Sequence, residues 1–363
     1  MSANNVILIT GAAGYWGGQV ARLLAARSDL HVIGVDAIPL PEPIKGLDFI
    51  QADVRNAKLL DLLQAEQVDT LVHLAFIESR RPSEHAFDSN VMGTMKVFGA
   101  ARAAGVKKIV LRSSTAVYGA QPTNSAFLRE SHPLRGSAQT GWIRDLVEIE
   151  AFCNGFRMQA SDICLTILRF PNVIGPTIST PMTRYLSLRT PPVLLGFEPQ
   201  MQFLHETDAI QALVQAVDTD APGIFNVGAE TAVPLDKALA ITGRLPLPVF
   251  HLFAYWGSAL LGSSTQEKVM PFELDYIRYP WVGDLQRMHE ELNFTPQYSA
   301  EEALREFAGQ QRLSAFKPGA ETDTQAEERL HDILERRGRK RRSGQTDSPI
   351  LEDDEQEEEE INE

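Results

Sequence analysis

The chain has 363 residues, of which 44% are hydrophobic and 23% charged, an ordinary composition for a soluble globular protein that can bury a sizeable core. Its formal net charge is −14. The segment from Lys317 onward has 16 acidic and 8 basic residues, a net of −8, so the rest carries −14 + 8 = −6. That balance argues weakly against a nucleic-acid groove in the body. The most apolar long stretch, residues 245–262, contains two prolines and a histidine, so we expect no transmembrane segment.

The first predicted strand is an apolar run over residues 6–9, and three glycines, Gly11, Gly14 and Gly17, follow it. A helix is predicted to begin near Tyr15. At such a turn one glycine supplies unusual backbone angles, another lets a phosphate approach, and a third lets helix pack on strand. The helix N-terminus presents N–H groups to a pyrophosphate. The pattern therefore predicts a dinucleotide-binding turn.

A second predicted strand, residues 31–36, ends in the carboxylate of Asp36. Its distance from the glycines is close to that expected for an acid that binds ribose. The alternative is a tight strand-to-helix turn with a helix-capping aspartate and no ligand.

Strands and helices alternate further along the chain. Strands are predicted over residues 47–54, 69–75, 107–112 and 163–169, and helices over 58–64, 86–104 and 140–156. This alternation predicts an α/β fold with a doubly wound, Rossmann-type, mostly parallel sheet. Ligands of such sheets lie beyond the carboxyl ends of the strands. The residues expected there are Asp36, Asp53, Leu74, Ser114 and Pro171.

The pattern loosens after Pro171. Short extended pieces over residues 201–205 and 223–227 are mixed with helices over 209–217, 235–242 and 300–307. We expect a smaller α/β lobe that closes over the ligand edge. The predicted domains are residues 1–175 for dinucleotide binding, with returns later in the chain, 176–316 for substrate binding, and 317–363 as a tail.

The tail has a possible helix over residues 324–337, a basic run from Arg336 to Arg342 and an acidic run over residues 352–360. Blocks of like charge repel and favour disorder. The basic run could contact nucleic acid or anionic lipid, but neutralisation by the nearby acidic run is the favoured interpretation.

Two cysteines, Cys153 and Cys164, form neither a metal-binding spacing nor a disulfide framework. We expect both to be reduced in a cytoplasmic protein. The first strand starts almost at the N-terminus, so we expect no signal peptide.

Several further motifs share one resemblance. They are Gly11-Ala-Ala-Gly14-Tyr15-Trp16-Gly17, Asp36, Asp53-Val54, His73-Leu74-Ala75, Asn90, Ser113-Ser114-Thr-Ala-Val-Tyr118-Gly119, Leu168-Arg-Phe-Pro171-Asn172-Val173-Ile-Gly-Pro176 and Gln202-Phe-Leu-His205-Glu-Thr-Asp208. Over about residues 4–310 the chain resembles the extended short-chain dehydrogenases, the NAD-dependent epimerase/dehydratase family.

The resemblance implies NAD bound across the strand ends. It implies the pyrophosphate at Gly11, Gly14, Tyr15, Trp16 and Gly17, the adenosine ribose at Asp36, the adenine at Asp53 and Val54, the length of the cofactor along Leu74 and Ala75, the nicotinamide near Pro171, Asn172 and Val173, and further cofactor contacts at Asn90 and Ser113. An acid at Asp36 favours NAD over NADP, because a 2′-phosphate would meet like charge.

The chain departs from the family at the catalytic Tyr-x-x-x-Lys motif, where the lysine lowers the pKa of a tyrosine that exchanges a proton with the substrate hydroxyl. An ungapped alignment puts Trp142 and Leu146 at these two positions. A shifted register does not help, since no lysine lies between Lys108 and Lys237. Of the family's catalytic residues only Ser114 remains, and a serine hydroxyl alone is a poor base.

Three accounts follow. The first is an NAD(H)-binding protein with low or no oxidoreductase activity, and the second is an active NAD-dependent enzyme with a substitute base. The candidates for that base are Tyr118, His205, Asp145 and Glu148. The substrate implied for an active enzyme is a sugar nucleotide or another secondary alcohol. The third account is a non-enzymatic interaction module. The family also implies a homodimer through the helices 86–104 and 140–156.

Four other features have alternative interpretations. His73 is predicted to be a packed core histidine rather than a catalyst. Arg169 could meet a phosphate or an internal carboxylate, and Arg184 and Arg189 could contact a nucleotide diphosphate or only solvent. The apolar stretch 247–261 could line a pocket or rest on a membrane, but packing between lobes is favoured.

Overall fold

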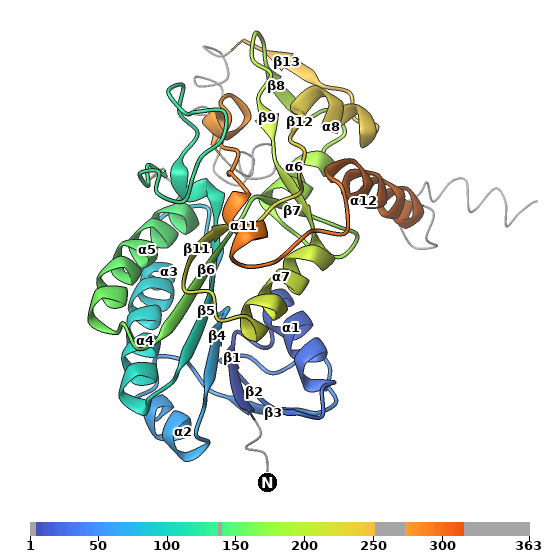
Figure 1. Cartoon of the computed structure of the whole chain (residues 1–363). Coiled ribbons are helices and arrows are strands. Elements are labelled where there is room, and N and C mark those ends of the chain that lie inside the picture. Colours follow the sequence, from blue (N-terminus) through green and yellow to red (C-terminus); the bar gives the residue numbers. More distant parts are fainter. Residues whose placement is uncertain (1–4, 137–139, 251–272, 316–363) are drawn as a thin grey trace, which may run out of the picture. The chain divides into compact units, whose positions relative to one another are not determined.

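The computed structural model describes residues 5–136, 140–250 and 273–315. Its main feature is a parallel seven-stranded sheet in the order β11-β6-β5-β4-β1-β2-β3 (Figure 1). The strands are β1 (Asn5–Thr10), β2 (Leu30–Asp36), β3 (Leu47–Gln51), β4 (Thr70–His73), β5 (Lys108–Ser114), β6 (Cys164–Phe170) and β11 (Gly223–Asn226). The predicted doubly wound α/β fold is confirmed.

Helices cover both faces of the sheet (Figure 1). One face packs against α1 (Tyr15–Ala25) and α7 (Glu206–Asp218), and the other against α2 (Leu59–Ala65), α4 (Gly93–Ala104) and α5 (Gly141–Gln159). The helix predicted over residues 86–104 is a succession of α3 (Glu84–Phe87), a π-helical turn over Asp88–Met92, and α4. It ends as predicted at Gly105, which has a φ of 78°.

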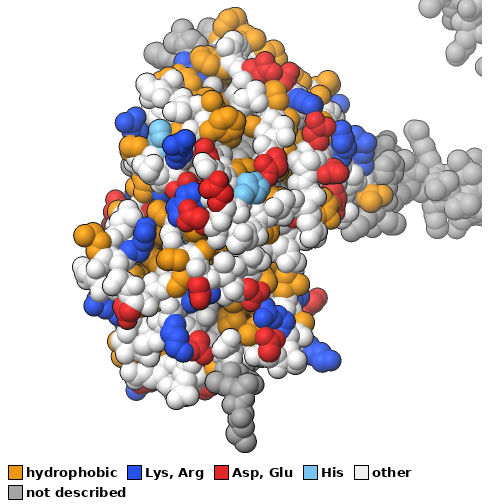
Figure 2. Space-filling view, viewed as in Figure 1, with side chains coloured by type: hydrophobic (Ala, Val, Ile, Leu, Met, Phe, Trp, Pro, Cys, Tyr) orange, Lys and Arg blue, Asp and Glu red, His pale blue; other side chains and the backbone are white. Residues whose placement is uncertain are grey.

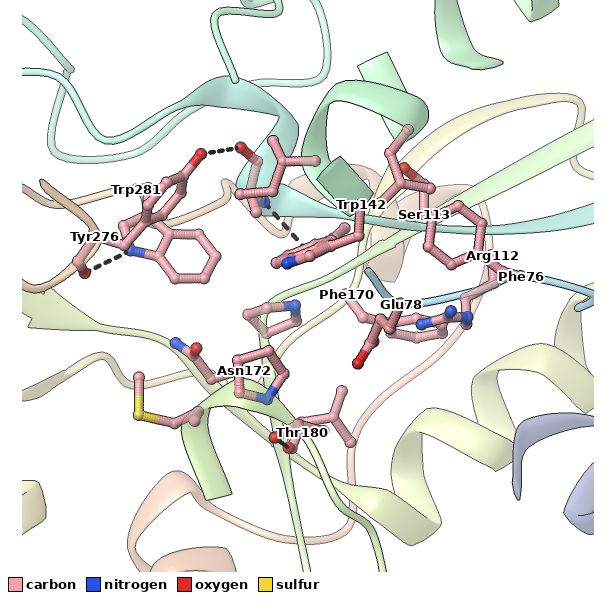
Figure 3. A pocket seen from close by; sticks show the side chains of 18 of the residues that line it. Phe76, Glu78, Arg112, Ser113, Trp142, Phe170, Asn172, Thr180, Tyr276 and Trp281 are labelled. Carbon is pink, nitrogen blue, oxygen red and sulfur yellow. Dashed lines mark hydrogen bonds between the residues drawn. The ribbon is translucent and has the colours of Figure 1, made fainter. Parts of the chain in front are cut away.

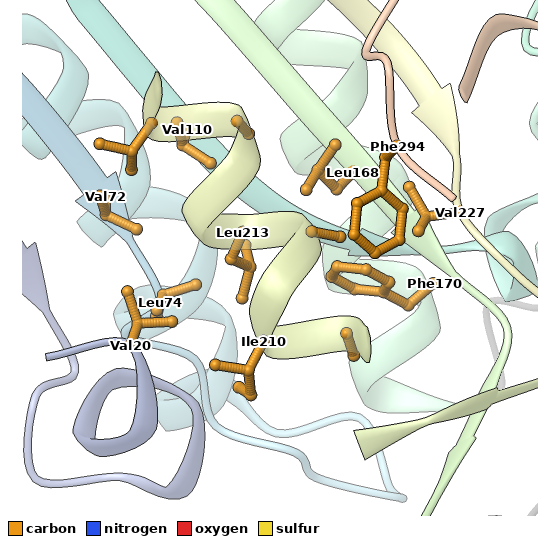
Figure 4. Packing of buried hydrophobic residues seen from close by; sticks show 14 of the residues in the cluster. Val20, Val72, Leu74, Val110, Leu168, Phe170, Ile210, Leu213, Val227 and Phe294 are labelled. Carbon is orange, nitrogen blue, oxygen red and sulfur yellow. The ribbon is translucent and has the colours of Figure 1, made fainter. Parts of the chain in front are cut away.

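The apolar faces of α1 and α7 meet the sheet in one core (Figure 4). Val20 of α1 and Ile210 and Leu213 of α7 are buried with Val72 of β4 and Val110 of β5. The spacing of these helical residues puts them on one face of their helices. This packing holds the beginning of α1 at the carboxyl edge of the sheet.

Strand β11 and helix α7 come from residues after 175, within the segment predicted as the smaller lobe. β11 pairs with β6 in parallel, from Gly223 beside Thr166 to Asn226 beside Arg169, and all four of its residues are buried. The two elements are therefore returns of the chain to the sheet domain.

The remaining elements complete the described chain, and most of them surround a second apolar cluster that includes Tyr185, Phe203, Leu239 and Leu304; Met288, in the short helix over residues 286–290, belongs to the first core instead. These elements are a 3₁₀ turn over Thr115–Tyr118, β7 (Asn172–Ile174), α6 (Pro181–Ser187), β8 (Pro192–Leu194), β9 (Gln200–Met201), β10 (Phe203–His205), β12 (Val233–Pro234), α8 (Leu235–Ile241), β13 (Leu247–Val249), a 3₁₀ turn over Leu274–Ile277, α11 (Gln286–Glu290) and α12 (Ala300–Ala315). Three two-stranded ladders join β7 with β10, β9 with β12, and β8 with β13.

Two predicted regions lie wholly or mostly outside the described residues. The tail 317–363, with its basic and acidic runs, is one of them. Of the apolar stretch 247–261, the structure describes only residues 247–250, where β13 pairs with β8. The described part up to Gln311 forms one compact unit.

On the face shown in Figure 2, acidic and basic side chains are interspersed. Within the described ranges, no helix combines the length and the hydropathy needed to span a bilayer.

A buried ionic network lies behind the carboxyl ends of β5 and β6. The Arg169 Nε lies 3.0 Å from Glu150 Oε1, and its Nη1 donates to the Tyr118 hydroxyl at 2.7 Å. The Ser113 hydroxyl donates to the same carboxylate at 2.5 Å. Of the two partners predicted for Arg169, the structure shows the internal carboxylate.

His73 is the buried core histidine that the sequence predicts. Its Nδ1 lies 2.7 Å from the Thr10 hydroxyl and its Nε2 2.9 Å from the Thr94 hydroxyl. Burial lowers the pKa of His73 to about 4, so the imidazole is neutral in the folded protein near neutral pH.

We predict that His73 makes the folding stability fall in mild acid. Because its folded pKa lies below the unfolded value of 6.5, this contribution is complete above pH 6.5 and is lost as the pH falls toward 4. Urea unfolding should show a loss of about 2 kcal/mol between about pH 6.5 and 4.5 in the wild type. His73→Gln should lack this component, and the exposed His85→Gln should keep it. An unchanged pH slope in His73→Gln would contradict the prediction.

Candidate functional site

The turn between β1 and α1 is too tight for side chains at two glycines. Gly11 has a φ of 74°, and a Cβ there would lie 2.6 Å from the backbone N of Ala75. A Cβ on Gly17 would lie 2.1 Å from the carbonyl oxygen of Gly11. Gly14 is the N-cap of α1, and it provides no side-chain cap. The first turn of an eleven-residue helix is thus left without a side-chain cap at the sheet edge.

The hydroxyl of Tyr15, at the start of α1, donates to Glu206 Oε2 at 2.8 Å. Burial, with Glu206 also contributing, raises the pKa of this phenol. Glu206 also accepts the backbone N–H of Ile178 at 2.6 Å. The Tyr15 side chain therefore fastens α1 to α7, and any contact of Tyr15 with a pyrophosphate would use its backbone.

Asp36 lies beside the glycine turn, as predicted. Its carboxylate accepts the backbone N–H of Ala13 at 3.0 Å and that of Ile38 at 3.2 Å. The acid at the end of β2 is thereby held against the turn. This is the placement that a ribose contact requires, while the contact itself stays a prediction.

Asp53, predicted near the adenine with the half-buried Val54, already has a cationic partner. Its Oδ2 lies 2.6 Å from Arg55 Nη2, and the Arg55 hydrogen bonds are the largest effect that lowers the pKa of Asp53. Arg55 also pairs with Asp88. The Asp53 carboxylate is therefore already paired with Arg55.

Leu74 and Ala75 follow β4, and their backbone lies against the glycine turn. Asn90, in the π-helical turn, receives the backbone N–H of Ile77 at 2.8 Å and donates to Asp145 Oδ2 at 2.9 Å. Asn90 therefore orders the segment that follows β4 and links it to α5, rather than pointing at an open site.

A pocket opens at the carboxyl ends of β5 and β6 (Figure 3). It brings together Trp16, Ser113, Ser114, Trp142, Leu146, Pro171, Asn172 and Val173 from the predicted site. The other predicted cofactor residues do not line it: Asn90 lies in the π-helical turn, and the rest lie at the glycine turn or follow β2, β3 and β4. In Figure 3, Arg112, Phe76 and Glu78 lie at one end and Tyr276 and Trp281 at the other, with Trp142 between them.

Trp142 and Leu146 stand one helical turn apart on α5, and both line the pocket. The indole N–H of Trp142 is shielded from solvent and has no hydrogen-bond acceptor among the described residues. The Leu146 side chain is buried. At these two positions α5 offers the pocket neither a phenol nor a cation.

The two serines at the end of β5 differ in their partners. The Ser114 hydroxyl accepts the backbone N–H of Ala116 at 3.2 Å, so its own proton is still available. The Ser113 hydroxyl is committed to Glu150.

None of the four candidate substitute bases lines this pocket. Tyr118 is buried, donates to Asn226 Oδ1 at 2.7 Å, and has its pKa raised to about 12 by burial. His205 is buried and stacks on Tyr298 with 4.0 Å between ring centroids. Asp145 is buried and receives hydrogen bonds from Arg144, and Glu148 is exposed.

Several pocket residues were absent from the sequence prediction, among them Phe76, Glu78, Arg112, Tyr276 and Trp281. Arg112 could have been found, because it precedes Ser114 by two residues on a strand and so points to the same side. Tyr276 and Trp281 come from a distant segment without a recognisable motif. Arg184 and Arg189 are exposed and lie outside the pocket lining.

The chain is similar to several known proteins. It is 32% identical over 312 residues to the uncharacterized protein Rv0501 of Mycobacterium tuberculosis, with 83% of each chain covered. It is 30% identical over 275 residues to a UDP-glucose 4-epimerase of Mycolicibacterium smegmatis, covering 67% of this chain and 85% of the relative. The structure of MoeE5 in complex with UDP-glucuronic acid and NAD superposes with a TM-score of 0.66 at 25% identity, covering 85% of this chain and 100% of MoeE5.

A family model matches residues 7–228. The match spans the glycine turn, the pocket residues of β5, α5 and β6, and the last strand of the sheet. The resemblance seen in the sequence is thereby confirmed. The chain belongs to the NAD dependent epimerase/dehydratase family.

Proposed function

We propose that this protein binds NAD(H) and has low or no oxidoreductase activity, because Trp142 and Leu146 stand where its family carries the catalytic tyrosine and lysine. The observation that carries the proposal is the apolar face that α5 presents to the pocket. An indole N–H is not a comparable acid, and leucine has no charge with which to lower a neighbouring pKa.

The residues around the glycine turn fit a dinucleotide. Glycine at position 17 lets α1 begin tight against the turn, because a Cβ there would collide with the Gly11 carbonyl. In addition, α1 has no side-chain cap, and Asp36 has an acceptor carboxylate beside the turn. The N-terminus of α1 would hold the diphosphate and Asp36 the ribose hydroxyls. The solved relative MoeE5 contains NAD, which supports NAD as the cofactor.

Bound NAD would supply a hydride acceptor. Oxidation of a secondary alcohol also requires a base for the hydroxyl proton, and Ser114 is the remaining pocket residue that the family would use. Its hydroxyl can orient a substrate oxygen but is a poor base near neutral pH. Loss of a positioned base costs about 10²–10⁴-fold in rate, so we expect little turnover.

A second candidate is an active epimerase, dehydratase or dehydrogenase that acts on a nucleotide sugar or another secondary alcohol. The observation that favours it is Tyr276, a phenol in the pocket wall whose hydroxyl donates to the Ala116 carbonyl at 2.9 Å. A homodimer through α4 and α5 and a cytoplasmic location remain predictions from the family and the sequence.

We predict that calorimetry will detect NAD⁺ and NADH binding and that Asp36→Ala will weaken it about tenfold or more, because two ribose hydroxyls lose a charged acceptor. Asp36→Asn keeps an oxygen for the Ala13 N–H and separates ribose binding from the integrity of the turn. The exposed Asp48→Ala on β3 is the matched control. Absence of binding by the wild type would refute the proposal and favour an interaction module.

We predict that the double substitution Trp142→Tyr with Leu146→Lys will raise NADH production from NAD⁺ and UDP-glucose or a simple secondary alcohol about a hundredfold over the wild type. The matched control is Trp142→Phe with Leu146→Lys, which has the cation but no hydroxyl. Robust turnover by the wild type, lost in Tyr276→Phe, would instead establish the second candidate.

A further inference from the structure

Two N–H donors in the pocket have no acceptor in the described part of the chain. They are Nε of Arg112, on β5, and Nε1 of Trp142, on α5, and both atoms are shielded from solvent. A shielded donor without an acceptor is costly to the folded state. Two such donors in one pocket point to a ligand that brings acceptors.

Arg112 is held without being neutralised. Its guanidinium lies 4.7 Å from the ring centroid of Trp16 and 5.6 Å from that of Phe76. Trp16 in turn stacks on Phe170 with 5.6 Å between centroids. Aromatic rings stabilise a cation without occupying its N–H groups, so Arg112 is oriented while its donors remain unused.

Arg169 lies on β6, next to the strand β5 that carries Arg112, at the same edge of the sheet. Arg169 donates to Glu150, to the Tyr118 hydroxyl and to the Glu130 carbonyl. Within the residues described, Arg112 makes neither a hydrogen bond nor an ion pair. These hydrogen bonds give Arg169 a structural role, whereas no comparable bond accounts for the charge of Arg112.

The carboxylate that influences Arg112 is Glu78. It also lines the pocket, and its charge partly offsets the lowering of the Arg112 pKa by burial. The two side chains are not close enough to form an ion pair. Since Glu78 repels negative charge, this end of the pocket favours an anion with a single charge over a dianion.

We propose that Arg112 is the anion-binding residue of this pocket and receives a singly charged oxyanion, a carboxylate or a phosphodiester, from a ligand that lies along Trp142. The guanidinium matches the two oxygens of such a group in geometry and charge. The anion belongs either to the diphosphate of the bound cofactor or to the carboxylate of a second ligand. The first of these two sources rests on the proposed function, which this inference deepens.

The test uses the full chain and its own fluorescence. Three of its four tryptophans, Trp16, Trp142 and Trp281, line the pocket, so ligand binding should change the emission. Sodium benzoate is the carboxylate probe, and benzamide is its uncharged counterpart. ADP-ribose, whose two phosphates each carry one charge as in the cofactor, and adenosine form the corresponding pair for the diphosphate.

Arg112→Met should weaken the binding of at least one anionic probe about tenfold or more and leave its uncharged counterpart unaffected. Glu78→Gln should act in the opposite direction and tighten it by roughly twofold or more. Arg112→Lys keeps the charge but lacks the planar guanidinium, so its affinity for the anionic probe should lie between those of the wild type and Arg112→Met. Arg112→Lys also provides the test if Arg112→Met folds poorly.

A loss confined to ADP-ribose would assign the anion to the cofactor, and a loss confined to benzoate would assign it to a second ligand. If the wild type binds no anionic probe better than its uncharged counterpart, or if the Arg112 variants bind all probes as the wild type does, the proposal is wrong. Absence of NAD⁺ and ADP-ribose binding with intact benzoate binding would refute the proposed cofactor but leave Arg112 as an anion site.

Discussion

The close approach of the β1–α1 turn to the end of β4 is the constraint on which the site depends. Because a Cβ at Gly11 or Gly17 would collide with backbone atoms, α1 can begin directly at the sheet edge only with glycine at both positions. The packing of Val20 against α7 and the sheet then fixes the helix. Asp36 completes the arrangement by receiving the N–H of Ala13. One steric requirement thus leaves an uncapped helix N-terminus and a carboxylate side by side.

Helix α5 presents an apolar wall to the neighbouring pocket. Its two buried acidic residues serve the interior: Asp145 binds Asn90 and Arg144, and Glu150 binds Arg169 and Ser113. The face that remains for the pocket carries Trp142 and Leu146. The charged side chains of the pocket come from other segments: Arg112 lies on β5 between aromatic rings, and Glu78 follows β4.

The sheet and the glycine turn were predictable because they rest on local signals: apolar runs of strand length, helical periodicity, and glycines between them. The buried role of His73 followed from its position in an apolar strand, whereas for Arg169 the sequence left a phosphate and an internal carboxylate open. The pocket was only half predictable. Trp142 and Leu146 could be placed by alignment, whereas Tyr276 and Trp281 reach the pocket through tertiary folding that no local pattern encodes. Asp53 bonds to Arg55, and Asn90 bonds to Asp145. These internal partners became known only from the structure.

The most direct test of the account is energy transfer from tryptophan to NADH in the wild-type protein. If the nicotinamide lies beside Pro171, Asn172 and Val173, which line the same pocket as Trp142 and Trp16, bound NADH will quench tryptophan emission and the nicotinamide will emit when the tryptophans are excited. Excess NAD⁺ will abolish both effects. Saturating NADH without any transfer would contradict the account, since the nicotinamide would then lie elsewhere or the cofactor would not bind.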